Sequence, residues 1–99
     1  MANEYTAVRA NFHALLHLQQ LTETRNNTIE VVRNGAVQRN LGGYSGVSTY
    51  RRQDGTKICE QSFYGGTTNG CARYFNEAEE LVGEDYSTGG GVIETRVFQ

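Results

Sequence analysis

Apolar residues recur at steps of three and four near the start of the chain. Tyr5, Val8, Phe12, Leu15 and Leu16 would form one stripe on a helix. This spacing predicts an amphipathic helix over about residues 3–21. The polar stretch that follows, over residues 22–27, is typical of a loop.

Two short β-prone runs come next, Thr28–Arg33 and Ala36–Leu41, separated by Asn34-Gly35. Asn-Gly favours positive φ at both turn positions and is a strong hairpin signal. A two-residue turn would place three pairs opposite one another: Val32 with Val37, Glu30 with Arg39, and Thr28 with Leu41.

A second hairpin is predicted from Gly46–Arg52 and Thr56–Tyr64, with its turn at Asp54-Gly55. A two-residue loop would set Arg52 opposite Lys57, a like-charge pair that costs free energy. We therefore expect a three-residue loop with a bulge at Gly55, which places Tyr50 opposite Ile58.

The pattern then returns to a helical period. A second amphipathic helix is predicted over about residues 70–82, with Thr68 or Asn69 as its N-cap and Gly83 as its stop. Its apolar side would consist of Cys71, Tyr74, Phe75, Ala78, Leu81 and Val82. A glycine-rich loop over residues 87–91 leads to a last strand, Val92–Phe98.

These elements predict an α+β fold in a single domain, residues 1–99. The expected order is α-β-β-β-β-α-β, an antiparallel sheet with two helices packed on one face. The sequence has no apolar run of the roughly 20 residues that a membrane span needs, and no basic start followed by an apolar stretch. We therefore expect a cytoplasmic protein, in which Cys59 and Cys71 are free, buried thiols.

Charge is distributed unevenly along the chain. Residues 1–57 contain seven Arg and Lys against four Asp and Glu, whereas residues 58–99 contain two against seven. Such a split concerns binding partners, because the summed charge of a surface steers association. The late acids are concentrated in and just after the predicted second helix: Glu77, Glu79, Glu80, Glu84 and Asp85.

Catalytic and cofactor motifs are weak in this sequence. His13 and His17 have the spacing of two zinc ligands on a helix, but Ala14 stands where a zinc peptidase has its glutamate, and no third ligand is evident. The glycine-rich loop at residues 65–70 matches neither the dinucleotide nor the Walker pattern. We expect no metal, no cofactor and no enzymatic activity.

The acidic residues support the first functional hypothesis, a non-catalytic protein-binding inhibitor. A compact row of carboxylates can occupy a basic groove that otherwise holds nucleic-acid phosphates. The expected partner is a host protein complex that handles nucleic acid. No segment carries a family motif; the analogy is one of type, to the short inhibitors of phages and mobile elements, anti-CRISPR proteins included.

Two alternatives come from other classes. The basic hairpins could bind RNA or single-stranded DNA through Arg39, Arg51, Arg52, Lys57 and Tyr50, a mixture of cations and an aromatic ring found on single-strand platforms. The chain could also be a structural subunit that self-associates, as a homodimer for example, through an exposed strand edge or the first helix.

Overall fold

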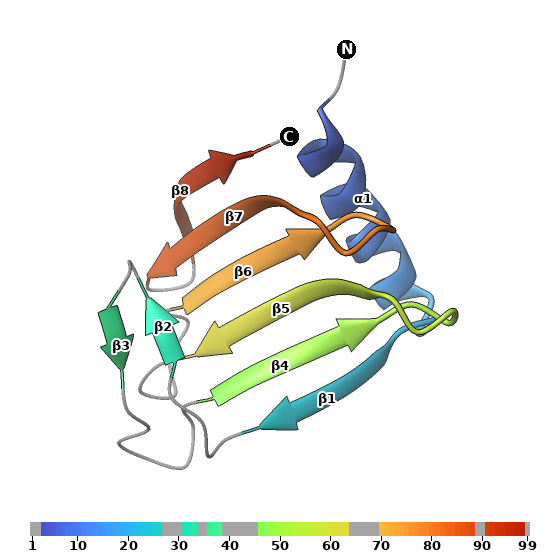
Figure 1. Cartoon of the computed structure of the whole chain (residues 1–99), viewed down its shortest axis with the longest axis horizontal. Coiled ribbons are helices and arrows are strands. Elements are labelled where there is room, and N and C mark those ends of the chain that lie inside the picture. Colours follow the sequence, from blue (N-terminus) through green and yellow to red (C-terminus); the bar gives the residue numbers. More distant parts are fainter. Residues whose placement is uncertain are drawn as a thin grey trace.

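One antiparallel sheet of six strands dominates the structure, and a single helix packs across it (Figure 1). The computed structural model describes residues 3–26, 31–33, 36–38, 46–63, 70–88 and 91–98. The elements are α1 (Glu4–His17), β1 (Thr22–Asn26), β2 (Val31–Arg33), β3 (Ala36–Gln38), β4 (Gly46–Arg51), β5 (Lys57–Phe63), β6 (Gly70–Phe75), β7 (Leu81–Thr88) and β8 (Gly91–Val97).

The strands of the large sheet lie side by side in chain order, β1-β4-β5-β6-β7-β8. The β2–β3 hairpin forms a sheet of its own near one end of β5. As predicted, Val32 lies opposite Val37 in this hairpin. The predicted pairs of Glu30 with Arg39 and of Thr28 with Leu41 lie outside the described residues.

The predicted fold class is wrong, because the second helix does not form. Residues 70–75 and 81–88 are the strands β6 and β7, joined by a turn, so the chain is mostly β. The apolar residues suit a helical period, but β6 lies between two strands, β5 and β7, and its backbone groups pair on both sides. Pairing with distant strands has overridden the local helical preference.

Two smaller expectations are also corrected. The polar stretch predicted as a loop contains β1, an edge strand whose five residues are all exposed. In the β4–β5 hairpin Tyr50 lies opposite Cys59 and Arg51 opposite Lys57, so Ile58 occupies the bulge, and the expected Tyr50–Ile58 pair does not form. Gly55 has φ +91°, as its role in the turn requires.

The predicted first helix is confirmed over a shorter range. It begins after Asn3, whose side chain accepts a hydrogen bond from the Thr6 amide at 2.8 Å, and it ends at His17. Within the described part of the chain α1 is the only helix, and it is too short and too polar to cross a bilayer.

An aromatic cluster holds α1 on the sheet. Phe12 is almost fully buried and meets Tyr50 of β4 edge to face at 5.2 Å between ring centroids, and Tyr74 of β6 at 5.9 Å. Tyr5, about two turns earlier on α1, also meets Tyr74 edge to face, at 5.7 Å between ring centroids. These contacts fix the helix across β5, β6 and β7.

The position of α1 also depends on a glycine in β7. A Cβ at Gly83 would lie 2.8 Å from the Tyr5 ring atom Cγ and 3.0 Å from the Arg96 carbonyl. We predict that Gly83→Ala lowers the free energy of unfolding by about 1–3 kcal/mol, because Tyr5 must move away from the sheet.

Urea unfolding monitored by circular dichroism measures this loss. Gly91→Ala is the matched control, since a Cβ there meets nothing within 4 Å. Equal stability of the two variants would show that α1 tolerates displacement from β7.

Candidate functional site

The turn between β6 and β7 is built around the side chain of Asn76. Its carbonyl oxygen accepts hydrogen bonds from the amides of Ala78 at 3.0 Å and Glu80 at 2.9 Å. The backbone closes the same turn through Glu79 N–H to Asn76 at 2.9 Å, and Glu79 itself has φ +60°. The turn therefore has a defined shape although four of its five residues are exposed.

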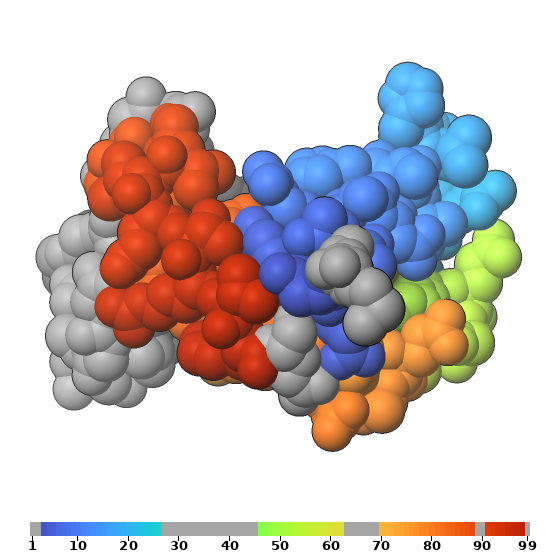
Figure 2. Space-filling view, turned by 90° about the horizontal axis from the view of Figure 1, so that it is seen from above, coloured from blue at the N-terminus to red at the C-terminus, as the bar shows by residue number. Residues whose placement is uncertain are grey.

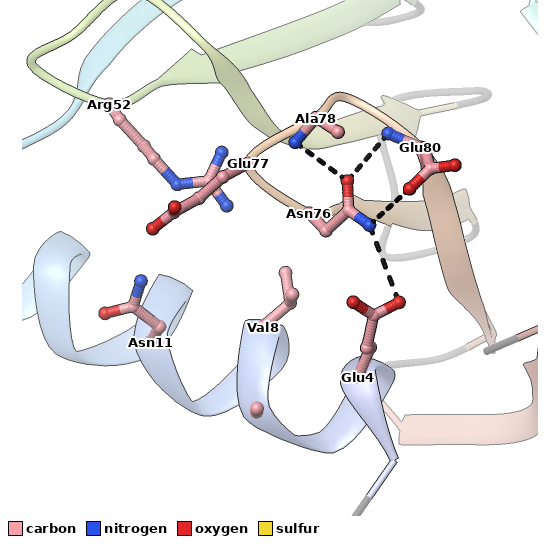
Figure 3. A pocket seen from close by; sticks show the side chains of 9 residues that line it. Glu4, Val8, Asn11, Arg52, Asn76, Glu77, Ala78 and Glu80 are labelled. Atoms are coloured by element: carbon pink, nitrogen blue, oxygen red, sulfur yellow. Dashed lines mark hydrogen bonds between the residues drawn. The ribbon is translucent and has the colours of Figure 1, made fainter.

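Asn76 also joins this turn to the start of α1. Its side-chain nitrogen donates to the carboxylate of Glu80 at 3.0 Å and to that of Glu4 at 3.5 Å (Figure 3). Glu4 lies in the first turn of α1, where the helix dipole favours a negative charge. Two carboxylates from distant parts of the sequence are thus held near one another.

A groove of about 610 Å³ lies between α1, the β4–β5 turn and the β6–β7 turn. Its carboxylates come from Glu4 and the β6–β7 turn, and Val8 of α1 points toward that turn (Figure 3). The lining residues are Glu4, Ala7, Val8, Asn11, Arg52, Asn76, Glu77, Ala78 and Glu80.

Arg52 is the one basic residue that lines this groove, and its guanidinium group is engaged by the protein itself. It donates to the Lys57 carbonyl and the Phe75 carbonyl, each at 3.0 Å, and to the Thr56 hydroxyl at 3.1 Å. Arg52 thereby ties the β4–β5 turn to the end of β6. Its role in the groove is to support one wall.

Two groups of acids stand out among the described residues; Glu23 of β1 and Asp54 of the β4–β5 turn belong to neither, since both are exposed, form no ion pair and lie away from the groove. Four acids are paired: Glu60 and Glu84 with Arg73, Asp85 with Arg9, and Glu94 with Arg96. The acids around the groove have no cation within ion-pair distance among the described residues: Glu4, Glu77, Glu79 and Glu80. Unneutralised negative charge therefore gathers at this end of the molecule.

The sequence-predicted acidic face is divided by the structure. Glu77, Glu79 and Glu80 lie together on the exposed β6–β7 turn, whereas Glu84 and Asp85 are buried on opposite faces of β7. Glu84 accepts from Arg73 at 3.0 Å and from the Tyr86 hydroxyl at 2.9 Å. Neither Glu84 nor Asp85 is free to contact a partner.

Asp85 is 3% exposed and connects four elements. It accepts hydrogen bonds from the hydroxyls of Tyr5 at 2.5 Å, Thr95 at 2.8 Å and Tyr74 at 3.3 Å, and its other neighbour is the Arg9 guanidinium at 3.3 Å. Burial and the Asp85 carboxylate raise the pKa of Tyr5, so this phenol stays a donor. The carboxylate is satisfied by the fold and is structural.

The residues predicted for the alternative nucleic-acid-binding site are also only partly available for binding. Tyr50 is buried against Phe12, so its ring cannot stack on a base, and Lys57 lies over the Phe75 ring at 4.3 Å and 3.5 Å from Glu60. Arg51 is exposed and donates to the Gly55 carbonyl at 3.1 Å. Arg39 lies outside the described residues.

The two cysteines are free and buried, as expected. The register places Cys59 opposite Tyr74 and Cys71 opposite Ser62, so their side chains point to opposite faces of the sheet. Burial raises the pKa of both thiols, that of Cys71 to about 11. Neither has the properties of an activated nucleophile.

Metal binding has no evident site in the described part of the chain. It contains no group of three or more His, Cys, Asp and Glu side chains placed to hold an ion. His13 and His17 are both exposed on α1.

No family model, curated protein or solved structure matches this chain.

Glu4, Val8, Asn11 and Asn76 belong to the groove and were not singled out from the sequence. Asn76 carried a usable signal, because asparagine directly after a β-prone aromatic pair and before a polar run favours a turn. The turn signal of Asn76 was missed because residues 70–82 were predicted as a helix. Glu4 had no local signal, since only the packing of α1 on the sheet brings it to this turn.

The Asp85 contacts make a stability prediction. Asp85→Asn keeps the size and shape of the side chain but replaces one acceptor oxygen by an NH₂ donor that faces the hydroxyls. We therefore expect it to lower the free energy of unfolding by about 2–4 kcal/mol. Most of this loss comes from the buried hydrogen bonds, because the Arg9 side chain is 44% exposed. Thermal and urea unfolding measure it, with Glu79→Gln on the exposed turn as a control that should unfold like the wild type. Near-equal stability of the two variants would contradict a structural role for Asp85.

The thiols give a second prediction. At pH 8 a thiol with a pKa near 11 is roughly one part in a thousand thiolate, so native Cys71 should react with Ellman's reagent far more slowly than an exposed cysteine. Both cysteines should react promptly once the protein is unfolded in urea. A fast phase from the native protein would show that one of these thiols is accessible and activated.

Proposed function

We propose that the protein acts by binding a basic segment of another protein in the groove between α1 and the β6–β7 turn. The observation that carries this proposal is the gathering at this groove of acids without an ion pair among the described residues: Glu4, Glu77 and Glu80, with Glu79 beside them on the turn. Fixed charges without a counterion attract a ligand of opposite sign.

The composition of the groove suits a lysine or arginine side chain. Ala7, Val8 and Ala78 offer apolar surface to the aliphatic stem of such a residue, and Glu4, Glu77 and Glu80 surround it with acceptors for the cationic head. The guanidinium of Arg52 is held by two carbonyls and a hydroxyl but keeps its charge, so the three carboxylates and this one cation leave the lining with a net charge of 1 − 3 = −2.

Binding in this groove would inhibit a partner whose basic segment also binds nucleic acid. Proteins that handle nucleic acid carry clustered lysines and arginines that hold phosphates. A partner captured through such a cluster would lose access to nucleic acid, with no chemical step on either side. The described residues give less support to direct RNA or single-stranded DNA binding, because Tyr50 is buried and Arg52 and Lys57 make contacts within the fold.

A charge reversal in the groove tests the proposal with a short peptide rich in lysine and arginine as the probe. Glu77→Lys should weaken binding about thirtyfold, because the reversal changes the charge by two units and each nearby unit charge contributes roughly 1 kcal/mol even in water. Isothermal titration at low salt measures the affinity. Glu23→Lys on β1 is the matched control, since Glu23 is exposed, changes the net charge equally and lies away from the groove.

The site is checked independently by nuclear magnetic resonance. The probe should shift the Val8 methyl and Asn76 side-chain amide signals of the wild type, and the same probe concentration should shift them much less in Glu77→Lys. Equal loss of affinity in both variants would show that only net charge matters, and the groove would then be rejected as the binding site.

A further inference from the structure

The last strand of the sheet leaves its outer edge without a partner among the described residues. β8 pairs with β7 on one side only, and all seven of its residues are exposed. Figure 2 looks onto this edge and shows β8 uncovered beside the start of α1. An open edge is a template for another strand.

This edge is also apolar, unlike the opposite one. Large hydrophobic side chains are about half exposed or more along it: Val92 (52%), Ile93 (64%), Val97 (48%) and Phe98 (52%). The other edge strand, β1, has the sequence Thr-Glu-Thr-Arg-Asn, which is polar throughout. Natural proteins protect free edges with polar residues, so β8 is the edge suited to pairing.

The hydrogen-bond pattern defines which backbone groups of β8 face outward. The Phe98 amide donates to the Val82 carbonyl at 2.9 Å, and Glu84 lies opposite Arg96 in the same register. Inward and outward groups alternate along an antiparallel strand. The N–H and C=O of Thr95 and Val97 therefore point away from β7.

The sequence of β8 is complementary to itself in the register that uses these groups. When two copies run antiparallel with Thr95 opposite Thr95, Ile93 lies opposite Val97, and Val92 lies opposite Phe98. The outward groups of Thr95 then meet those of Thr95 in the other copy, and those of Val97 meet Ile93, the bulge residue, which has no partner in the β7 register. Apolar residues face apolar residues at both ends of the contact, and Thr95 and the charged pairs lie in its middle.

Charge selects this register over its neighbours. Glu94 lies opposite Arg96 of the other copy, and Arg96 opposite Glu94. Within one copy these two side chains already lie 3.6 Å apart, so the four charges would alternate in sign. A shift by two residues in either direction would instead place Glu94 opposite Glu94 or Arg96 opposite Arg96, which is destabilising.

We propose that the partner of this edge is a second copy of the chain, paired antiparallel through β8 about a two-fold axis at Thr95. The same strand serves both copies, so the contact closes as a dimer. It joins two six-stranded sheets into one continuous sheet. The proposal does not rest on the groove, whose residues come from α1 and two turns and include none from β8.

Charge exchange tests the pairing directly. Glu94→Arg alone and Arg96→Glu alone should each raise the dimer Kd about tenfold or more, because each turns two symmetry-related attractive pairs into repulsive ones. The double variant, Glu94→Arg with Arg96→Glu, should restore the dimer. An equimolar mixture of the two single variants should form a heterodimer. Sedimentation equilibrium over about 1 µM to 1 mM measures all four cases, since an interface of one strand pair is small.

Glu23→Arg on β1 is the control with the same change in charge, and it should dimerise like the wild type. In the wild type, hydrogen exchange at the Thr95 and Val97 amides should slow as concentration rises. A monomeric wild type at 1 mM, or a dimer unaffected by both single variants, would overturn the proposal. Species that keep growing with concentration would indicate β8 pairing with β1 of the next copy, and would overturn it too.

Discussion

The buried carboxylate of Asp85 is the constraint on which the arrangement of the elements depends. It binds side chains from α1, β6 and β8 at once, through Tyr5 and Arg9, Tyr74, and Thr95. A buried acceptor must be satisfied, so these elements cannot shift independently of one another. Gly83, two residues earlier on β7, allows Tyr5 to approach closely enough to reach it. The position of α1 is therefore set by a polar contact as well as by the aromatic cluster around Phe12.

This placement of α1 creates the two surfaces to which we assign binding. Toward the β6–β7 turn, the helix brings Glu4 to Asn76 and closes the groove. Toward β8, it lies beside the strand at the surface without covering its edge (Figure 2). Each surface carries polar groups that the described part of the fold leaves without a partner. In the groove these are carboxylates without an ion pair, and at the edge of β8 they are backbone N–H and C=O groups that pair with no other described strand. Such groups are compensated by solvent or by a partner molecule.

The sequence predicted the elements that local rules determine. The Asn-Gly signal predicted the pairing of β2 with β3, Gly55 marked its turn, the stripe from Tyr5 to Leu15 marked α1, and the alternation after Gly91 marked β8. Residues 70–82 were predicted wrongly because Cys71, Tyr74, Phe75 and Leu81 fit a helical period and a strand–turn–strand equally well, and pairing with β5 decides between them. For the same reason the predicted acidic face is divided between the β6–β7 turn and β7. Consecutive residues in a strand point to opposite faces, so the side chains of Glu84 and Asp85 are buried on the two faces of β7. Glu77, Glu79 and Glu80 lie on the exposed β6–β7 turn.

The two edge strands of the sheet differ in how well they are protected against pairing with a strand of another molecule. β1 is protected by polar side chains and β8 is not, so association through strands can start at one edge only. An edge that pairs with a copy of itself terminates the assembly after one step, whereas an edge that pairs with the opposite edge extends it without limit. Glu94 and Arg96 alone do not decide between these outcomes, because β1 carries Glu23 and Arg25 at the same spacing. The apolar residues of β8 supply the discrimination, since Val92, Ile93, Val97 and Phe98 find apolar partners on a second β8 and none on β1.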